Sequence, residues 1–348
     1  MISRINNFDF LRLVFASLVI ITHSYALSGA TQGDPLARLT NGQMEFSYLG
    51  VHGFFIISGY LIFKSLLRCK GLPDYYWKRL LRLFPALFVV LFLTVLLAPA
   101  VYEGSVPYLQ NKSVYTYIPQ NLTLFFRQKG IDGVFESNPY KHSINGSLWT
   151  ICYEFSMYVM VSLLFFIRKK AFLVKTAVIL LFISSYILSI FHPYFLYGLF
   201  LKMALGSNHF YNLMCFFAGG MVLTYLNASK RTENTLIITS FIVLIVSVYL
   251  NISQYTCYIT LPLLVILLGK RSTPYLNKVG SVLGDTSYGI YIYSFPIQQA
   301  LMYFFKLDTA LLLILSLPLS ILLGYISWHL IEKRALSYKD LFAKKAIQ

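Results

Sequence analysis

Long apolar runs alternate with shorter polar stretches along nearly the whole chain, and this pattern predicts helices that cross a membrane. A membrane-spanning helix needs about 20 mostly apolar residues. Ten runs approach that length, at about 8–27, 47–67, 84–101, 147–167, 173–191, 210–227, 235–251, 256–269, 282–304 and 309–330. Alternating segments of about ten residues, which are typical of membrane barrels, are absent. We therefore expect an all-α, polytopic integral membrane protein with about ten transmembrane helices.

Polar stretches rich in glycine and proline predict loops outside the membrane. Residues 28–45 contain a single basic residue, and residues 102–146 form the longest polar stretch of the chain. A loop of the second length is uncommon unless it carries function. Residues 192–209 are too short and too interrupted for a span, and we interpret them as a re-entrant or surface segment.

Residues 72–82 form a short aromatic and basic segment between two apolar runs. Asp74 is its expected N-cap, because aspartate accepts hydrogen bonds from the first backbone N–H groups of a helix. Pro85 has no backbone N–H and is expected to bend the chain into the next helix.

The composition agrees with a membrane protein, since 57% of the residues are hydrophobic, 12% are charged and the mean hydropathy is +0.65. A chain of 348 residues with this composition is too apolar to be soluble. The net charge of +16 could indicate nucleic-acid binding, but the basic residues lie beside apolar runs, which is typical of membrane topology. No nucleic-acid partner is therefore expected.

The distribution of basic residues predicts the orientation of the chain. The five basic clusters are 64–82, 168–175, 230–231, 270–278 and 332–345. Ten spans with the N-terminus inside place all of them on one side. Both termini are then expected in the cytoplasm, with residues 332–348 as a cytoplasmic tail. The first apolar run is expected to be retained, because Arg12 interrupts it and it is too long for a signal peptide.

The cysteines give no sign of a metal site. Cys69, Cys152, Cys215 and Cys257 are scattered without a CxxC motif or metal-like spacing. We interpret them as small packing residues and expect neither a metal nor a bound cofactor.

The first apolar run carries two ionisable residues, Arg12 and His23. At about 100° a residue they fall on one helix face, about 16 Å apart along the axis, with Ala16 and Val19 between them. Ionisable side chains inside a membrane are costly and usually functional, so this stripe is a candidate site. The alternative is structural: Arg12 pairs with Asp9 at the interface, and His23 caps the end of the helix.

The fourth apolar run carries a further ionisable residue, Glu154, on one face with Ser147 and Tyr158. The depth of Glu154 matches that of His23. The carboxylate is therefore expected to fix the tautomer of the imidazole, which would act as a proton acceptor. A structural bond from Glu154 to Arg12 or to a backbone group is the alternative.

Arg79 and Arg82 lie three residues apart on one face, at the predicted cytoplasmic mouth of the bundle. Guanidinium groups bind phosphate in a bidentate fashion, so the pair could clamp a phosphate. Contact with lipid headgroups is the alternative.

The second apolar run places glycines on both sides of Ser58. Glycines allow helices to pack closely or a backbone to approach a ligand. Packing explains most such segments, and a pocket role for Ser58 is the competing interpretation.

Six short motifs occur in order along nearly the whole chain. They are Asp9-x-x-Arg12 with His23, Phe54-Phe55-x-x-Ser58-Gly59-Tyr60, Arg79-x-x-Arg82 leading to Pro85, Ser147-Leu148-Trp149-Thr150-x-x-x-Glu154, Leu283-Gly284-Asp285-Thr286-Ser287-Tyr288-Gly289-Ile290-Tyr291 and Trp328-x-x-x-Glu332. Together they resemble the acyltransferase 3 family of integral membrane acyltransferases, which often O-acetylate surface polysaccharides. Many members have glycine where this chain has Leu13, and many have a histidine in the segment that reads Ser294-Phe295-Pro296 here. Because this chain lacks the second of these residues, the histidine, His23 is the expected catalytic histidine.

The resemblance implies one membrane acyltransferase domain over residues 1–348. It implies acetyl-CoA as the acyl donor, entering from the cytoplasm, and a glycan hydroxyl as the acceptor, in the bilayer of a bacterial inner membrane. The expected catalytic residues are His23, Glu154 and Arg12, the expected donor-binding residues are Lys78, Arg79 and Arg82, and the expected acceptor or pocket residues are Ser58, Asn145, Ser147, Trp149 and Tyr158.

A protein of a different class remains the alternative, a proton-coupled transporter or flippase that uses the same buried Arg12, His23 and Glu154. Transporters often contain internal repeats and broken helices at matching positions. The sequence shows neither, apart from the interrupted segment 192–209.

Overall fold

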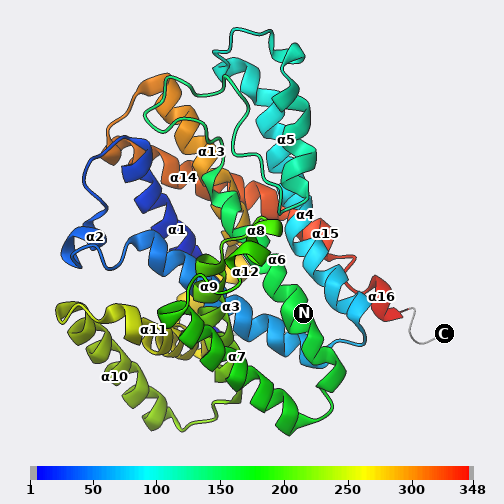
Figure 1. Cartoon of the computed structure of the whole chain (residues 1–348), viewed down its shortest axis with the longest axis vertical. Helices are drawn as coiled ribbons and strands as arrows, with labels where there is room; N and C mark the ends of the chain where they lie inside the picture. The colour runs from blue at the N-terminus through cyan, green and yellow to red at the C-terminus, as the bar shows by residue number, and fades with distance from the viewer. Residues whose placement is uncertain (1–5, 345–348) are drawn as a thin grey trace.

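The computed structural model describes residues 6–344 and shows a bundle of helices (Figure 1). Helices account for 75% of the chain, and residues 6–344 contain no strand apart from one isolated bridge between Tyr102 and Val134. The expected all-α fold is therefore confirmed.

The predicted apolar runs correspond to the long helices of the structure. These are α1 (Phe8–Leu27), α3 (Phe46–Arg68), α4 (Leu72–Leu97), α6 (Trp149–Ser162), α7 (Ala171–Phe191), α9 (Ser207–Val222), α10 (Lys230–Tyr249), α11 (Ser253–Lys270), α13 (Ser287–Phe305) and α14 (Thr309–Ser327). Shorter helices are α2 (Pro35–Leu39), α5 (Lys112–Leu122), α8 (Tyr197–Lys202), α12 (Val279–Val282), α15 (Lys333–Leu336) and α16 (Leu341–Lys344).

Within the described part of the chain, seven helical segments are long and apolar enough to cross a membrane. They are Phe8–Leu27, Phe46–Arg68, Leu72–Val101, Gly146–Ile167, Ala171–Phe191, Lys230–Tyr249 and Thr309–Leu336. Most residues of α9 and α13 are instead buried inside the bundle, where a helix does not need a wholly apolar surface. The protein is a multi-pass membrane protein, and the count of ten spans stays a prediction.

The segment before Pro85 differs from its prediction. Residues 72–82 do not form a separate surface segment, because α4 runs without interruption from Leu72 to Leu97 with Pro85 inside it. The proline removes one backbone hydrogen bond, which membrane helices tolerate when neighbouring helices support them. As a result, Arg79 and Arg82 belong to the same long helix that enters the bundle.

The five basic clusters meet at one end of the bundle. Arg168 donates a hydrogen bond to the backbone carbonyl of Cys69, and the ammonium groups of Lys64 and Lys270 lie 4.7 and 5.5 Å from the ring centre of Tyr60. Further bonds join Lys270 to Leu226, Arg271 to Asn234 and Arg82 to Glu332. This arrangement agrees with basic clusters on one side of the membrane, while the cytoplasmic position of the termini stays a prediction.

Residues 102–146 fold over one end of the bundle (top of Figure 1), where α5 packs against α4. The amide nitrogen of Asn138 donates to the backbone carbonyl of Gln299 at 2.9 Å, and the amide nitrogen of Gln299 donates to the carbonyl of Ser143 at 2.7 Å. The loop is thus tied to α13. In the segment 192–209, no residue of the short helix α8 is buried.

The glycines of α3 bring helices into backbone contact. A Cβ atom on Gly59 would lie 1.9 Å from the carbonyl oxygen of Phe217 on α9, and one on Gly220 would lie 2.1 Å from the carbonyl oxygen of Ile56. Small residues let membrane helices approach this closely. Close helix packing is therefore observed at Gly59 and Gly220, while the role of Ser58 stays a prediction.

We expect Gly59→Ala to lower the free energy of unfolding by about 1–3 kcal/mol, because the added methyl group must push two backbones apart. The measurement is the midpoint of thermal unfolding of the protein in detergent. Gly198→Ala is the matched control, since a Cβ atom there meets no atom within 4 Å. Equal unfolding midpoints for the two variants would contradict this account of the contact.

Candidate active site

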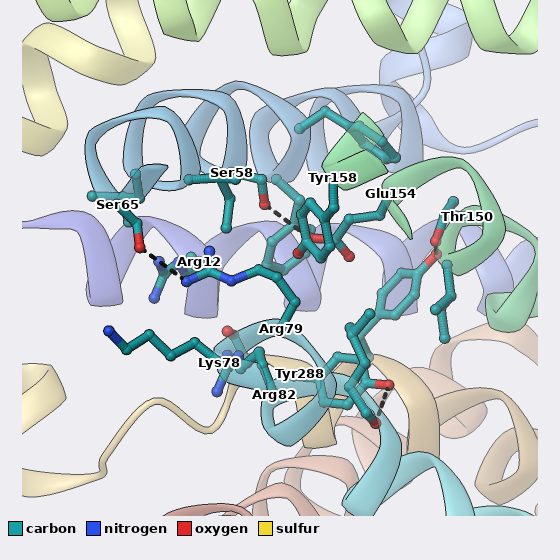
Figure 2. Close-up of a pocket in the computed structure, with 18 of the residues that line it drawn as sticks. Arg12, Ser58, Ser65, Lys78, Arg79, Arg82, Thr150, Glu154, Tyr158 and Tyr288 are labelled. Atoms are coloured by element: carbon teal, nitrogen blue, oxygen red, sulfur yellow. Dashed lines mark hydrogen bonds between the residues drawn. The ribbon is translucent and has the colours of Figure 1, made fainter. Parts of the chain in front are cut away.

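A cavity of about 350 Å³ lies among α1, α3, α4, α6 and α13, within the size range of ligand sites (Figure 2). We call it the basic cavity. Glu154 faces it together with the basic residues Arg12, Arg68, Lys78, Arg79, Arg82 and Lys339. Since Lys339 follows α15, the cavity lies at the end of the bundle where the basic clusters meet.

A second cavity, of about 670 Å³, lies among α1, α3, α7, α9 and α11. We call it the histidine cavity, because its lining includes His23, His52 and His209. The other lining residues with polar or aromatic side chains include Gln43, Tyr48, Trp149, Asn208, Asn212 and Gln254. Such a mixture can bind a ligand with many hydroxyl groups.

The two cavities lie toward opposite ends of α1. Arg12, near the start of this helix, lines the basic cavity, and His23, near its end, lines the histidine cavity. Ala16, 0% exposed, lies on the same buried face between them. The predicted common face of Arg12 and His23 is therefore present. Val51 and Tyr291 line both cavities and so form the wall between them.

Arg12 and Arg82 belong to a network of ion pairs beside the basic cavity. Arg12 lies 2.9 Å from Asp285 and 3.2 Å from Asp9. Arg82 lies 3.0 Å from Asp285 and 3.3 Å from Glu332. The predicted pair of Arg12 and Asp9 is thus observed, but as one part of a larger network. Two of the sequence motifs, those around Asp285 and Glu332, supply the carboxylates that neutralise the arginines.

Asp285 precedes α13 and is the centre of this network. Burial alone would raise the pKa of its carboxyl group, but the guanidinium charges of Arg12 and Arg82 outweigh burial and hold that pKa below its usual value. Asp285 therefore stays ionised between the two arginines at neutral pH.

Arg79 differs from its neighbours on α4. No ion pair joins it to any carboxylate among residues 6–344, and its Nε atom is buried without a hydrogen-bond partner. Its guanidinium group donates to Ser65 at 3.2 Å and lies 5.8 Å from the ring centre of Tyr158 (Figure 2). Lys78, in contrast, pairs with Asp74 at 2.8 Å. The phosphate clamp of Arg79 and Arg82 therefore stays a prediction, in which Arg82 is already paired with Asp285 and Glu332 whereas Arg79 forms no ion pair among the described residues.

Glu154 makes contacts other than those predicted. Its carboxylate accepts hydrogen bonds from Ser58 at 3.0 Å and from Tyr158, as the dashed lines in Figure 2 show. No hydrogen bond joins it to His23 or to Arg12 in the described part of the chain. The expected Glu154–His23 contact is corrected accordingly, since the two residues line different cavities.

His23 is held by packing. Its ring lies edge-on to Phe295 with 5.0 Å between ring centres, and its Nδ1 atom is buried without a hydrogen-bond partner among the described residues. Phe295 in turn packs against Gly146, where a Cβ atom would lie 2.4 Å from the ring. No protein group therefore fixes which nitrogen of the His23 imidazole carries the proton.

The other two histidines of the cavity are arranged differently. His52 has both nitrogens engaged, at 2.7 Å from the carbonyl oxygen of Tyr48 and 2.6 Å from the amide oxygen of Asn212. The exposed ring of His209 lies edge-on to Trp149 at 5.2 Å. Sequence reasoning missed these histidines, because the helices that bring them together are far apart in the chain.

The predicted acceptor or pocket residues separate into three groups. Ser58 and Tyr158 line the basic cavity, and Trp149 lines the histidine cavity. Asn145 and Ser147 line neither. Asn145 instead caps the turn that begins at Gly146, accepting from the backbone N–H of Ser147 at 3.1 Å, and it donates to the carbonyl of Ile292 at 2.8 Å. These hydrogen bonds indicate a structural role for Asn145.

The cysteines are packing residues, as expected. Cys69, Cys152, Cys215 and Cys257 are buried, and none of them forms a disulfide. Among residues 6–344, no group of three or more histidine, cysteine or acidic side chains is placed to hold a metal ion.

Comparison with known proteins identifies the family. A family model described as an acyltransferase domain matches residues 5–329. The chain is 31% identical over 355 aligned positions to an O-acetyl transferase of Shigella phage Sf6, covering 95% of this chain and 96% of that protein. It is 32% identical over 181 positions to nodulation protein 10 of Rhizobium leguminosarum bv. viciae, covering 47% of this chain and 45% of that protein. No solved structure matches the chain. Because the family model covers nearly the whole chain, the protein belongs to this family of acyltransferases, the acyltransferase 3 family that its motifs resemble.

Proposed function

We propose that this acyltransferase transfers an acetyl group from acetyl-CoA to a hydroxyl group of a cell-surface or lipid-linked glycan, in a bacterial inner membrane. The observation that carries the proposal is the pair of cavities toward opposite ends of one bundle, one basic and one lined by histidines, with a common wall. The phage relative, an O-acetyl transferase matched along nearly its whole length, supports acetyl as the transferred group. The family does not favour the transporter alternative.

The basic cavity suits a donor that carries phosphate groups. The unpaired guanidinium group of Arg79 can form charge-assisted hydrogen bonds with phosphate oxygens. Arg68 and Lys339 add positive charge to the same lining. The pantetheine arm of CoA can contact the apolar lining residues Phe54, Phe55, Leu61 and Ile62. The nucleotide of CoA would then lie at the opening of the basic cavity.

His23 is proposed as the general base. The acceptor hydroxyl attacks the thioester carbonyl carbon, so that a C–O bond forms and the C–S bond breaks. The hydroxyl proton passes to the imidazole of His23 and then to the departing CoA sulfur. The result is an O-acetyl ester and free CoA, with no other reactant consumed. Glu154 acts from the donor side, where it fixes Ser58 and Tyr158 in the wall of the basic cavity.

The test is transfer of labelled acetyl from acetyl-CoA in purified proteoliposomes, with extracted surface glycan as the acceptor. We expect ester-linked label in the glycan and an equal amount of free CoA. Calorimetry in detergent should also show CoA binding, which a proton-coupled transporter of this kind would lack. Absence of both CoA binding and acetylated glycan would overturn the proposal.

We expect Arg79→Ala to raise the KM for acetyl-CoA about 10- to 100-fold with little change in kcat, because charge-assisted hydrogen bonds are worth about 1.5–3 kcal/mol. Arg38→Ala is the matched control, since Arg38 is exposed on α2 and its side chain bonds to Gln32 alone among the described residues. An unchanged KM in Arg79→Ala would remove Arg79 from the donor site.

A further inference from the structure

The wall between the cavities consists of two side chains from different helices. Val51 lies on α3 and Tyr291 on α13, and they are the residues that the two linings have in common. Both are nearly inaccessible, at 8% and 7% exposed. If donor and acceptor occupy the two cavities, the acyl group must sit against this pair when it is transferred. We call Val51 and Tyr291 the acyl partition.

Contacts on α6 and α3 hold Tyr291 in place. Its hydroxyl lies 2.9 Å from the hydroxyl of Thr150, and its ring packs edge-on to Phe54 with 5.9 Å between ring centres. A hydroxyl bond at one end and an aromatic contact along the ring restrict its rotation. The ring of Tyr291 therefore forms a fixed side of the partition.

The backbone beside Val51 is packed tightly against α1. A Cβ atom on the preceding residue, Gly50, would lie 2.6 Å from the carbonyl oxygen of Phe15 on α1. This contact leaves α3 no space to shift toward α1. The side chain of valine is also restricted at χ1, so Val51 has little freedom to make room for a larger acyl group.

We propose that Val51 and Tyr291 select the length of the transferred acyl group and thereby exclude acyl chains longer than acetyl. The inference rests on the proposed function, because it assumes a thioester in the basic cavity and a hydroxyl in the histidine cavity. The donor enters from the basic cavity and His23 lies beyond the wall. The carbonyl carbon must therefore reach the partition, and any extra methylene group meets the two side chains.

The experiment compares kcat/KM for acetyl-, propionyl- and butyryl-CoA with one glycan acceptor. One methylene group is worth about 10- to 200-fold in discrimination by an apolar pocket. We expect the wild type to prefer acetyl over propionyl within this range, and Val51→Ala to reduce that preference at least tenfold. Val246→Ala is the matched control, because Val246 is exposed on α10, lines neither cavity and should leave the preference unchanged.

Further variants keep the test decisive if Val51→Ala folds poorly. Val51→Ile narrows the partition and should increase the preference for acetyl over propionyl, whereas Val51→Thr conserves the shape and should retain the wild-type preference. Unchanged preferences in Val51→Ala or Val51→Ile, in enzyme that transfers acetyl, would overturn the inference and leave the proposed function intact. A wild type that uses no CoA thioester would overturn the proposed function itself.

Discussion

Replacing His23 with alanine is expected to lower kcat for acetyl transfer about 10²- to 10⁴-fold, the usual contribution of a general base. His23 is the histidine of the cavity that has a buried nitrogen without a partner, whereas both nitrogens of His52 are engaged. Without His23, the hydroxyl proton has no acceptor beside the wall. The measurement is single-turnover transfer of labelled acetyl to glycan in proteoliposomes.

The affinity for CoA separates this effect from a general loss of structure. His23 lines the histidine cavity alone, so His23→Ala should bind CoA in detergent with the wild-type Kd. His142→Ala is the matched control, since His142 has a side chain 76% exposed and pairs with Glu136 at 3.5 Å. Wild-type kcat in His23→Ala would exclude His23 as the base, and loss of CoA binding would show that the substitution damages the fold.

The expected partnership of His23 with Glu154 shows what depth alone can predict. Each residue lies inside the bundle on a helix that the hydropathy pattern locates well, and α1 begins and ends within the predicted range 8–27. The depth of a residue in the membrane does not say which neighbouring helix its side chain faces. In the structure α1 packs chiefly against α3, α13 and α14, and Glu154 on α6 bonds to Ser58 of α3.

The acidic partner that Arg12 shares with Arg82 could not be predicted from the sequence for a related reason. Local spacing indicates the pair of Arg12 with Asp9, because residues three apart on a helix are neighbours. The shorter contact, from Arg12 to Asp285, joins residues 273 positions apart, which no local pattern reveals. The motif around Asp285 was visible in the sequence, but its role required the fold.

The histidine cavity could not be predicted for the same reason. His52 lies in α3 and His209 in α9, and each looks like an isolated histidine in an apolar or aromatic stretch. Only the contact of α3 with α9, which Gly59 and Gly220 make possible, brings these helices to one cavity.

Replacing Asp285 with alanine should lower the free energy of unfolding by about 3–5 kcal/mol, because it leaves two partly buried guanidinium groups without their common partner. The side chains of Arg12 and Arg82 are 18% and 23% exposed, so water compensates little of this loss. The measurements are the yield of folded protein and the midpoint of thermal unfolding in detergent.

A second substitution tests whether the loss comes from unpaired charge. Adding Arg12→Met to Asp285→Ala removes one of the two arginines that lose this partner. The double variant should recover at least about 1 kcal/mol of the free energy of unfolding, as expected for residues that interact directly. Asp9→Asn is the milder control, since Asp9 is 39% exposed and an i,i+3 ion pair on a helix contributes only about 0.2–0.5 kcal/mol. Additive losses in the double variant would mean that Asp285 does not stabilise the fold by neutralising Arg12. Recovery would show that Asp285 stabilises the fold by neutralising Arg12, so that the network of ion pairs beside the basic cavity is held together by this one carboxylate.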